Sequence, residues 1–340
     1  MQETNKQVLF ASRPIGWVSD DNFRFVTRDT DYPEHDGDVL IRNIYLSVDP
    51  YMRGRMNSAQ TYAAGFELGK VLTGGAIGQV EMSNNPNFKV GDFVNGMLGW
   101  EEYSMVRKAA GLVKVDPKAA PLSYYLGVLG MPGMTAYVGL LDMGEPKAGE
   151  TVYVSAASGA VGQIVGQIAK IKGCRVVGSA GSDEKVDFLL NELGFDAAFN
   201  YKTAATLGTG LRETCPDGID VYFENVGGAM LDAVLANINP YARIALCGMI
   251  SQYNLTQPEG INNLQSLLIN RAMIRGFIIS EHFDGLPGFI ADMTGWMRDG
   301  KLKYRETIAE GIDNAPAAFI GMLKGENFGK QIVRLGPDPA

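Results

Sequence analysis

The chain has 340 residues, of which 46% are hydrophobic and 20% are charged. At roughly 100–200 residues per domain, this length indicates two domains, each with enough apolar material to fold without disulfides. The net charge of −8 argues against nucleic acid and anionic membrane surfaces as partners, because both attract basic patches. The 42 glycines exceed the usual share of roughly 7%, which indicates many tight turns and close backbone approaches.

Cysteine usage and the N-terminus bear on the compartment. The three cysteines are scattered and form no C-x-x-C pair, which indicates a reducing environment, and we expect a cytoplasmic protein. The segment Met1–Lys6 lacks the basic-then-apolar layout of a signal peptide. The longest charge-free run lies between Lys118 and Asp142, and its glycines and prolines disfavour a single membrane-spanning helix. We expect this run to be a buried connector between domains, and we expect no membrane association.

The first half of the chain reads as short strands separated by turns. Turn residues stand at the joints of these strands, which is typical of a small barrel or sandwich. The expected strands are Asp38–Leu46, Gly69–Val80, Lys89–Val94 and Glu102–Lys108.

From about residue 128 the pattern changes to alternating strands and helices, which predicts an α/β fold with a doubly wound parallel sheet. The tail from Asp299 to Leu335 leaves this pattern, and we expect it to pack on the first domain. The expected strands are Thr151–Ser155, Arg175–Gly178, Val221–Glu224, Ile244–Cys247 and Ile274–Ile279, and the expected helices are Ala160–Ile171, Asp183–Leu193 and Ala229–Ile238.

A loop of small residues separates the first of these strands from its helix. A tight turn before a helix offers free N–H groups and the helix dipole to a pyrophosphate. Ala157 stands where the first glycine of G-x-G-x-x-G would be, and a close strand–helix contact alone would also explain Gly162. The flanking βα units favour a dinucleotide site whose cofactor-binding residues are Ala157, Ser158, Gly159, Ala160, Val161 and Gly162.

The end of the next strand indicates which dinucleotide is bound. NAD-binding folds carry an acid about twenty residues downstream that holds the ribose 2′-hydroxyl. Here the strand runs into an uncharged loop, and Asp183 and Glu184 are expected in the first turn of a helix capped by Ser182. Lys185 follows them. This arrangement favours NADP(H), although a solvated helix lysine explains Lys185 equally well.

No metal site is indicated by the residue pattern. The only two histidines, His35 and His282, lie in polar, turn-like segments and are expected at the surface. Cys174 and Cys247 are expected in strands as small core residues, and no Ser-His-Asp set can be assembled. A nicotinamide cofactor carries the hydride chemistry itself, so the protein must supply mainly a donor for the developing negative oxygen. A tyrosine hydroxyl is the obvious candidate.

Motifs spread over nearly the whole chain match one family, and they are Leu46–Met56, Ala156–Gly162, Gly178–Lys185, Phe195–Lys202, Glu224–Gly228, Cys247–Asn254 and Asn327–Lys330. The chain resembles the zinc-independent medium-chain dehydrogenase/reductases of the leukotriene B4 dehydrogenase, prostaglandin reductase and alkenal double-bond reductase group, and its curcumin-reductase-like members in particular. Relatives that use catalytic zinc carry a Gly-His-Glu segment near where Glu67–Lys70 stands here.

This resemblance implies a GroES-like β-barrel catalytic domain over 1–128, completed by 300–340, and a Rossmann NADP-binding domain over 129–299, with the cofactor between them. It implies that Lys185 and Tyr201 hold the 2′-phosphate, that Tyr253 faces the substrate carbonyl, and that Tyr51 and Tyr62 line the substrate pocket. Further cofactor-binding residues implied by the matching motifs are Thr135, Gly181, Ser182, Asn225, Cys247, Gly248, Tyr253, Asn327 and Gly329.

The implied activity is NADPH-dependent reduction of the C=C bond of α,β-unsaturated ketones and aldehydes. Hydride would go to the β-carbon, and Tyr253 would stabilise the enolate. Alternatives within enzymes are a quinone reductase or a zinc-free alcohol dehydrogenase, and a non-catalytic NADPH-binding protein is the alternative of another class. Members of the family are commonly dimers, so a homodimer is expected. The natural substrate among enones, enals and quinones stays open.

Overall fold

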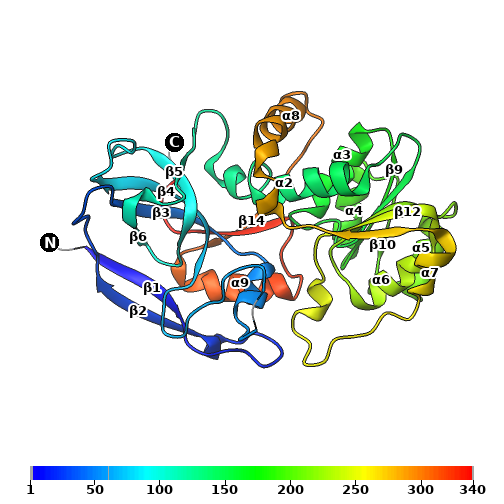
Figure 1. The fold of residues 1–340 in the computed structure, drawn as a ribbon, viewed down its shortest axis with the longest axis horizontal. Coiled ribbons are helices and arrows are strands. Elements are labelled where there is room, and N and C mark those ends of the chain that lie inside the picture. The colour runs from blue at the N-terminus through cyan, green and yellow to red at the C-terminus, as the bar shows by residue number, and fades with distance from the viewer. Residues whose placement is uncertain (1–2, 60, 339–340) are drawn as a thin grey trace. The chain divides into compact units, whose positions relative to one another are not determined.

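The computed structural model describes residues 3–59 and 61–338, and the chain divides into two compact units. The first unit comprises Met1–Gly127, Glu306–Asn327 and Gln331–Ala340, and the second comprises Val128–Arg305 and Phe328–Lys330. Figure 1 traces the chain by colour, with the C-terminal red and orange segments returning into the first unit as β14 and α9.

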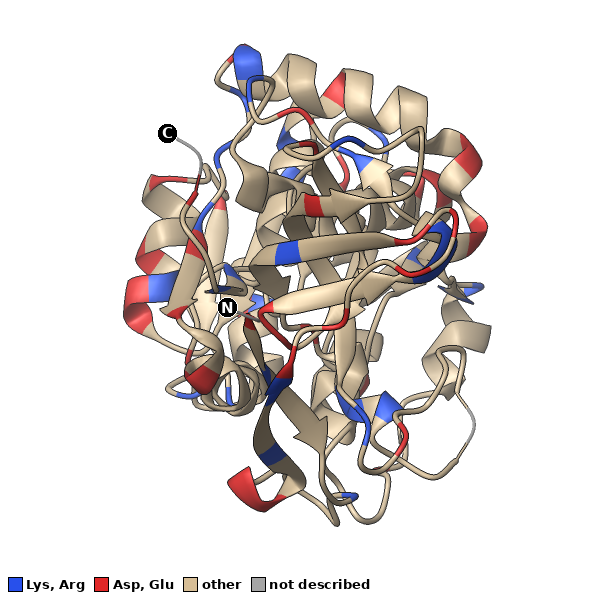
Figure 2. Cartoon of the chain, turned by 90° about the vertical axis from the view of Figure 1, so that its left-hand side faces the viewer, with Lys and Arg blue, Asp and Glu red and all other residues tan. Residues whose placement is uncertain are grey.

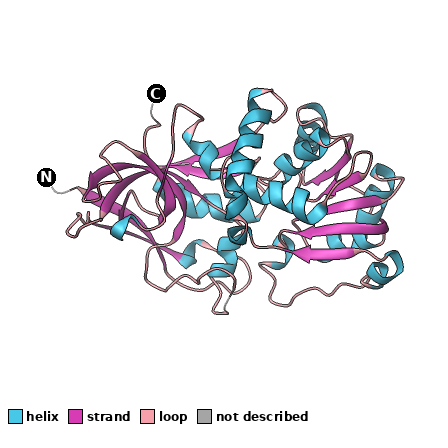
Figure 3. Ribbon diagram, turned by 45° about the horizontal axis from the view of Figure 1, so that its top comes forward, coloured by secondary structure: helices cyan, strands magenta, loops and turns pink. Residues whose placement is uncertain are grey.

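The second unit is built on a parallel sheet in the order β10-β9-β8-β11-β12-β13. Helices and strands alternate along this part of the chain, and Figure 3 distinguishes the helices from the strands by colour. The doubly wound sheet predicted for the second half is therefore confirmed. Its strands are β8 (Thr151–Val154), β9 (Arg175–Ala180), β10 (Ala197–Asn200), β11 (Ile219–Glu224), β12 (Ile238–Leu246) and β13 (Met273–Gly276).

The helices of this unit pack through apolar stripes. The helical period predicts an apolar stripe of Val161, Ile164, Val165 and Ile168. Ile164, Val165 and Ile168 are fully buried in α3, whereas Val161 precedes the helix and is half-buried. Ser182 caps α4 by accepting the Lys185 N–H at 3.3 Å. The helices are α2 (Met131–Val138), α3 (Gly162–Ile171), α4 (Asp183–Asn191), α5 (Leu207–Thr214), α6 (Gly228–Leu235), α7 (Gln265–Asn270) and α8 (Leu286–Arg298).

Several predicted boundaries in the second half were wrong. The helix expected to reach Ile238 ends at Leu235, because Ile238 already begins β12, a longer strand than predicted. The strand expected to run to Ile279 ends at Gly276. The run between Lys118 and Asp142 is mostly helical, with a 3-10 turn, α2 and a π turn over Gly139–Gly144. We did not predict β10, α5 or α8, since β10 has only four residues and α8 contains Pro287 and glycines.

The first unit contains a sheet in the order β14-β15-β3-β4-β5-β7, with β6 paired to β3, and a separate antiparallel pair of β1 and β2. Antiparallel pairing joins β3 to β4, β6 and β15, and β5 to β4 and β7. The elements are β1 (Thr4–Phe10), β2 (Phe23–Asp29), β3 (Val39–Ser47), α1 (Tyr51–Arg55), β4 (Thr73–Ser83), β5 (Phe93–Gly99), β6 (Tyr103–Val106), β7 (Val113–Lys114), β14 (Glu306–Glu310), α9 (Ala315–Leu323) and β15 (Lys330–Arg334).

An aromatic cluster ties the C-terminal segment into the core of the first unit. The ring of Trp100 stacks on Phe23 with 6.2 Å between centroids and meets Phe319 of α9 edge-on at 6.0 Å. Three predicted strands of this unit were too long or misplaced. β4 begins at Thr73, β5 begins at Phe93 after a turn, and β6 ends at Val106 before a 3-10 turn.

Positions of basic and acidic residues are interspersed along the ribbon in Figure 2. Several of these residues form ion pairs within one unit, such as Arg243 with Glu150 at 2.5 Å and Lys170 with Asp196 at 2.8 Å. Over the described ranges, no helix combines the length and the apolar character needed to cross a membrane.

Candidate cofactor and active site

The carboxyl ends of the parallel strands place most of the predicted cofactor residues along one edge of the second unit's sheet. Ser155 follows β8, Gly181 follows β9, Asn225 follows β11, Cys247 follows β12 and Phe277 follows β13. Open α/β sheets bind ligands at this edge. Phe277 was not among the predicted site residues. It lies at this edge because β13 pairs with β12, and the residue pattern does not reveal that pairing.

The loop between β8 and α3 brings backbone against backbone. A Cβ at Gly162 would lie 2.5 Å from the Ala156 carbonyl oxygen and 2.7 Å from the Ala157 Cα, so no larger residue fits without displacement. Ala156 itself has φ of 48°, a left-handed conformation that is unfavourable outside glycine. Close strand–helix packing therefore accounts for Gly162, which leaves the loop's donors as the feature that bears on a ligand.

Those donors are backbone N–H groups at the start of α3. The Ala157 N–H donates to Ser179 O at 2.9 Å, and the Gly159 N–H donates to Ala156 O at 2.9 Å. The N–H groups of Ser158, Ala160 and Val161 donate to no acceptor in the part of the chain that the structure describes. They lie together with the positive end of the α3 dipole, which is an arrangement that fits a pyrophosphate.

A returning segment of the chain holds this loop in place. The Gly329 N–H donates to Ser158 O at 3.1 Å, and Gly329 bridges to Gly159. The buried Gln163 side chain accepts the Arg305 N–H at 2.9 Å and donates to the Arg305 carbonyl at 3.1 Å. Gly329 has φ of 68°, and a Cβ at this position would collide with the Arg305 carbonyl oxygen. Both features require glycine here.

Of the two residues predicted to hold the 2′-phosphate, Tyr201 lies against Gly181, and Lys185 follows on the next helix. A Cβ at Gly181 would lie 2.9 Å from the Tyr201 hydroxyl and 3.3 Å from the Lys202 Cε. Lys185 lies on the first turn of α4, with its ammonium 5.9 Å from the centroid of the Phe328 ring. Burial, and then the charge of Lys202, lower the pKa of Lys185. Lys202 was not predicted as a site residue, although its motif matched the family.

Two loops meet at Glu224, the last residue of β11. Its carbonyl accepts the N–H groups of Cys247 at 3.0 Å and Gly248 at 3.1 Å. Asn225 is fixed by donating from its side chain to Ser155 O at 2.8 Å. Cys247 follows β12 and is half-buried, so the prediction that it lies in a strand was wrong; burial still raises the pKa of its thiol to about 12. Cys174 immediately precedes β9 and is buried.

Tyr253 lies at the end of the second of these loops, and its side chain folds back onto the loop. The hydroxyl oxygen accepts the Met249 N–H at 3.1 Å, and a Cβ at Gly248 would lie 3.1 Å from that oxygen. Because the hydroxyl accepts this hydrogen bond, its own proton is free to be donated elsewhere. Burial raises the pKa of Tyr253, so the group is a neutral donor at neutral pH.

The remaining predicted residues lie in both units. Thr135 is buried in α2 and donates its hydroxyl proton to Met131 O at 2.7 Å. Tyr51 begins α1 in the first unit, and burial, followed by the charge of Asp49, raises its pKa. Tyr62 is 67% exposed in the same unit. Asn327 also belongs to the first unit.

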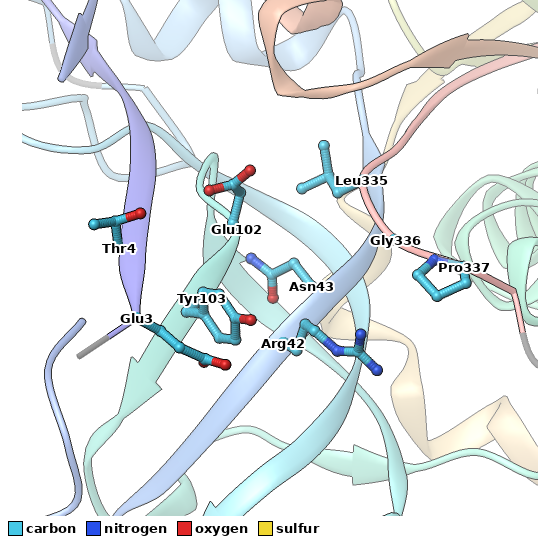
Figure 4. A pocket seen from close by; sticks show the side chains of 9 residues that line it. All are labelled: Glu3, Thr4, Arg42, Asn43, Glu102, Tyr103, Leu335, Gly336 and Pro337. Atoms are coloured by element: carbon cyan, nitrogen blue, oxygen red, sulfur yellow. The ribbon is translucent and has the colours of Figure 1, made fainter. Parts of the chain in front are cut away.

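Metal-ligating side chains and a hollow in the first unit are the other features that bear on ligand binding. Within residues 3–59 and 61–338, no three His, Cys, Asp or Glu side chains come close enough together to hold a metal ion. A hollow of about 520 Å³ in the first unit, shown in Figure 4, is lined by Leu335, Gly336 and Pro337 and by six polar residues, some of which already bond to protein groups. Arg42 pairs with Glu81 at 2.7 Å, and the Asn43 amide donates to Glu101 O at 2.8 Å.

The residues present fit a dinucleotide that carries a 2′-phosphate. Open N–H groups before α3 suit the pyrophosphate. The Tyr201 hydroxyl and the Lys202 side chain beside Gly181, with the charge of Lys185 on α4, suit the additional phosphate. A doubly wound parallel sheet with such an edge, together with an antiparallel unit completed by the C-terminal segment, defines the class of two-domain, dinucleotide-binding α/β proteins.

Comparison with known proteins narrows this class. Residues 6–115 match a family described as the N-terminal domain of oxidoreductase, and residues 160–294 match one described as zinc-binding dehydrogenase. The chain is 50% identical over 333 residues to a 2-alkenal reductase (NADP(+)-dependent) of Nicotiana tabacum, which covers 97% of each chain. It is 45% identical to an NADPH-dependent curcumin reductase of Escherichia coli, which covers 99% of each.

A solved structure agrees with these relatives. The crystal structure of CurA from Vibrio vulnificus in complex with NADPH superposes with a TM-score of 0.90 at 47% identity, covering 98% of this chain and 99% of that one. The chain belongs to the medium-chain dehydrogenase/reductases, in the group that contains the alkenal, curcumin and prostaglandin reductases. The predicted fold class, a GroES-like β-barrel domain plus a Rossmann domain, is confirmed.

Proposed function

We propose that this protein is an NADPH-dependent reductase of the C=C bond of α,β-unsaturated ketones and aldehydes. The observation that carries the proposal is the Tyr253 hydroxyl, a neutral donor whose proton is free because its oxygen accepts the Met249 N–H. The names of relatives that share 45–50% identity over nearly the whole chain support the same activity.

We assign cofactor binding to the second unit and the larger part of the substrate pocket to the first. The pyrophosphate would be held by the loop that ends at Gly162, and the 2′-phosphate by Lys185 and Tyr201. Asn225, Cys247, Gly248, Gly329 and, from the first unit, Asn327 would contact the rest of the cofactor, with Thr135 beside it. Tyr51 and Tyr62 would line the substrate pocket.

The proposed reaction needs a hydride and a proton. Bound NADPH would supply the hydride that adds to the β-carbon of the substrate. Tyr253 would donate a hydrogen bond to the carbonyl oxygen as negative charge develops there, which stabilises the enolate in the same way as an oxyanion hole. The α-carbon would then take a proton from water or from a tyrosine.

We also propose a homodimer and a cytoplasmic location. β13 is the last strand of its sheet, so one edge of it has no strand partner among the described residues. Leu268, Ile269 and Met273 next to this edge are 79%, 63% and 45% exposed. An open edge with exposed apolar side chains favours pairing with a second copy of the chain.

An NADPH-oxidation assay with several enones, enals and a quinone tests the function, with products identified by NMR, which distinguishes a saturated ketone or aldehyde from the unsaturated alcohol of the same mass. We expect saturated ketones or aldehydes two mass units heavier than the substrates. Unsaturated alcohols would show an alcohol dehydrogenase, preference for the quinone would show a quinone reductase, and NADPH binding without turnover would show a non-catalytic protein. Each of these three results contradicts the proposal.

A further inference from the structure

Lys202 reaches the end of β9 because of the register of two strands. β9 and β10 pair in parallel with Asn200 opposite Ala180, so Gly181 and Tyr201 leave the sheet at the same level. The Tyr201 N–H donates to Ala180 O at 3.1 Å, which continues the pairing by one residue. The Lys202 Cε lies 3.3 Å from the position of a Gly181 Cβ, so the Lys202 side chain lies against one of the predicted cofactor-binding residues.

Lys202 and Lys185 form a pair of like charges at this position. The charge of Lys202 is, after burial, the main cause that lowers the pKa of Lys185, and Glu184 offsets less than this repulsion. Lys202 forms no ion pair with any residue of the described ranges. Two ammonium groups held near each other repel. An anion bound by both would be attracted to each of them, and this attraction would offset the repulsion.

The acids nearest to this pair have other partners. The Asp183 carboxylate accepts the Asn200 side-chain amide at 2.7 Å. The Glu184 carboxylate lies 3.9 Å from the guanidinium of Arg305, which is itself stacked 3.7 Å from the centroid of the Phe328 ring. The two carboxylates of the first turn of α4 are therefore engaged with Asn200 and Arg305.

We propose that Lys202 is a specificity-determining residue that binds the 2′-phosphate of NADPH together with Lys185 and Tyr201. Asn200 is a positioning residue for it, because its side-chain oxygen accepts the Lys202 N–H at 3.0 Å while its amide holds Asp183. This inference rests on the proposed use of NADPH, and it adds a cation that neither the matching motifs nor the dinucleotide fold assigned.

The experiment measures binding without turnover. Titration calorimetry with 2′,5′-ADP and with 5′-ADP is carried out on the wild type, Lys202→Gln and Lys147→Gln. Lys147 is the matched control, since it is exposed before β8 at the opposite edge of the same sheet and its loss changes the net charge equally. We expect Lys202→Gln to raise the Kd for 2′,5′-ADP about tenfold, the effect of losing one charge-assisted hydrogen bond, and to leave 5′-ADP within about twofold.

Three results would overturn the inference: an unchanged Kd for 2′,5′-ADP, equal weakening of both nucleotides, or an equal effect of Lys147→Gln. A wild type that binds 5′-ADP as tightly as 2′,5′-ADP would refute it together with the proposed cofactor. If the wild type reduces no enone but Lys202→Gln selectively weakens binding of 2′,5′-ADP, only the proposed activity is refuted. Lys202 is exposed, so thermal unfolding should show the variants to be as stable as the wild type.

Discussion

Replacing Tyr253 with Phe removes one oxygen and keeps the ring. In the structure that oxygen accepts the Met249 N–H at 3.1 Å, and its proton is the one proposed to stabilise the enolate. The variant therefore separates two contributions of the hydroxyl, because the first acts on the stability of the folded loop and the second acts only when charge develops on the substrate.

The two contributions differ in size. Loss of the hydrogen bond to Met249 should lower the free energy of unfolding by about 1 kcal/mol, the usual net value for such a bond. Loss of a donor to a developing oxyanion costs about 2.7–4 kcal/mol, so kcat should fall roughly 100- to 1000-fold. NADPH affinity should change by less than about threefold, since the Tyr253 hydroxyl faces its own loop rather than the open N–H groups of the loop before α3.

Single-turnover NADPH oxidation with an enone gives the chemical step, and fluorescence titration gives the cofactor Kd. Tyr241→Phe is the control, because Tyr241 is 64% exposed on β12 and should leave both unchanged. A Tyr253→Phe enzyme whose rate stays within about threefold of the wild type would remove Tyr253 from the chemistry. A rate loss matched by an equal loss of NADPH affinity would make it a structural residue of the loop.

Three further results are expected. Lys185→Ala should raise the Michaelis constant for NADPH about tenfold or more and leave that for NADH nearly unchanged, whereas equal effects would contradict the phosphate assignment. Gly162→Ala should cost about 1–3 kcal/mol of stability and weaken NADPH binding, because its Cβ would lie 2.5 Å from Ala156 O, while Gly295→Ala on α8, with open space at its Cβ, should be tolerated. Burial raises the pKa of Cys215 to about 11 and that of Cys247 to about 12, so iodoacetamide should label neither within minutes at pH 7.5, as mass spectrometry would show. Rapid labelling of Cys247 would contradict the raised pKa of its thiol. These raised pKa values stabilise the fold fully below about pH 9, and that stabilisation should disappear as the pH rises through 11–12.

Much of the second unit's sheet could be predicted because its strands are short apolar runs next to amphipathic helices. The stripe of Ile164, Val165 and Ile168 specified α3, and the small residues before it specified the loop. β12 shows the limit of this reasoning. Its first half contains Asn239, Pro240 and Tyr241, which read as a turn. In the structure Ile238 pairs with Ile219 of β11, and regular pairing with β11 and β13 begins only at Arg243, after an irregularity that the residue pattern does not reveal.

The hydrogen-bond donors of the candidate site were harder to predict from the sequence than its glycines. Whether an N–H of the loop is open depends on which carbonyls come near, and Ala157 and Gly159 use theirs while Ser158 does not. Lys202 has no periodicity or spacing that marks it, since its position follows from a four-residue strand that the pattern did not reveal. Tyr253 was named by family resemblance, and its bond to Met249 depends on a loop conformation that no residue pattern encodes.

Glu224 holds together the two loops that follow β11 and β12 at the carboxyl edge of the sheet. Its carbonyl accepts the N–H groups of Cys247 and Gly248, and its buried carboxyl accepts the Tyr222 hydroxyl at 2.7 Å and the Val226 N–H at 2.6 Å. One fully buried residue therefore binds both the loop that begins with Asn225 and the loop that ends with Tyr253. Burial raises the pKa of this carboxyl, and donors gathered on its Oε1 partly offset that effect. A loop fixed in this way places the Tyr253 hydroxyl before substrate arrives, which is the condition under which a single neutral donor can lower a reaction barrier.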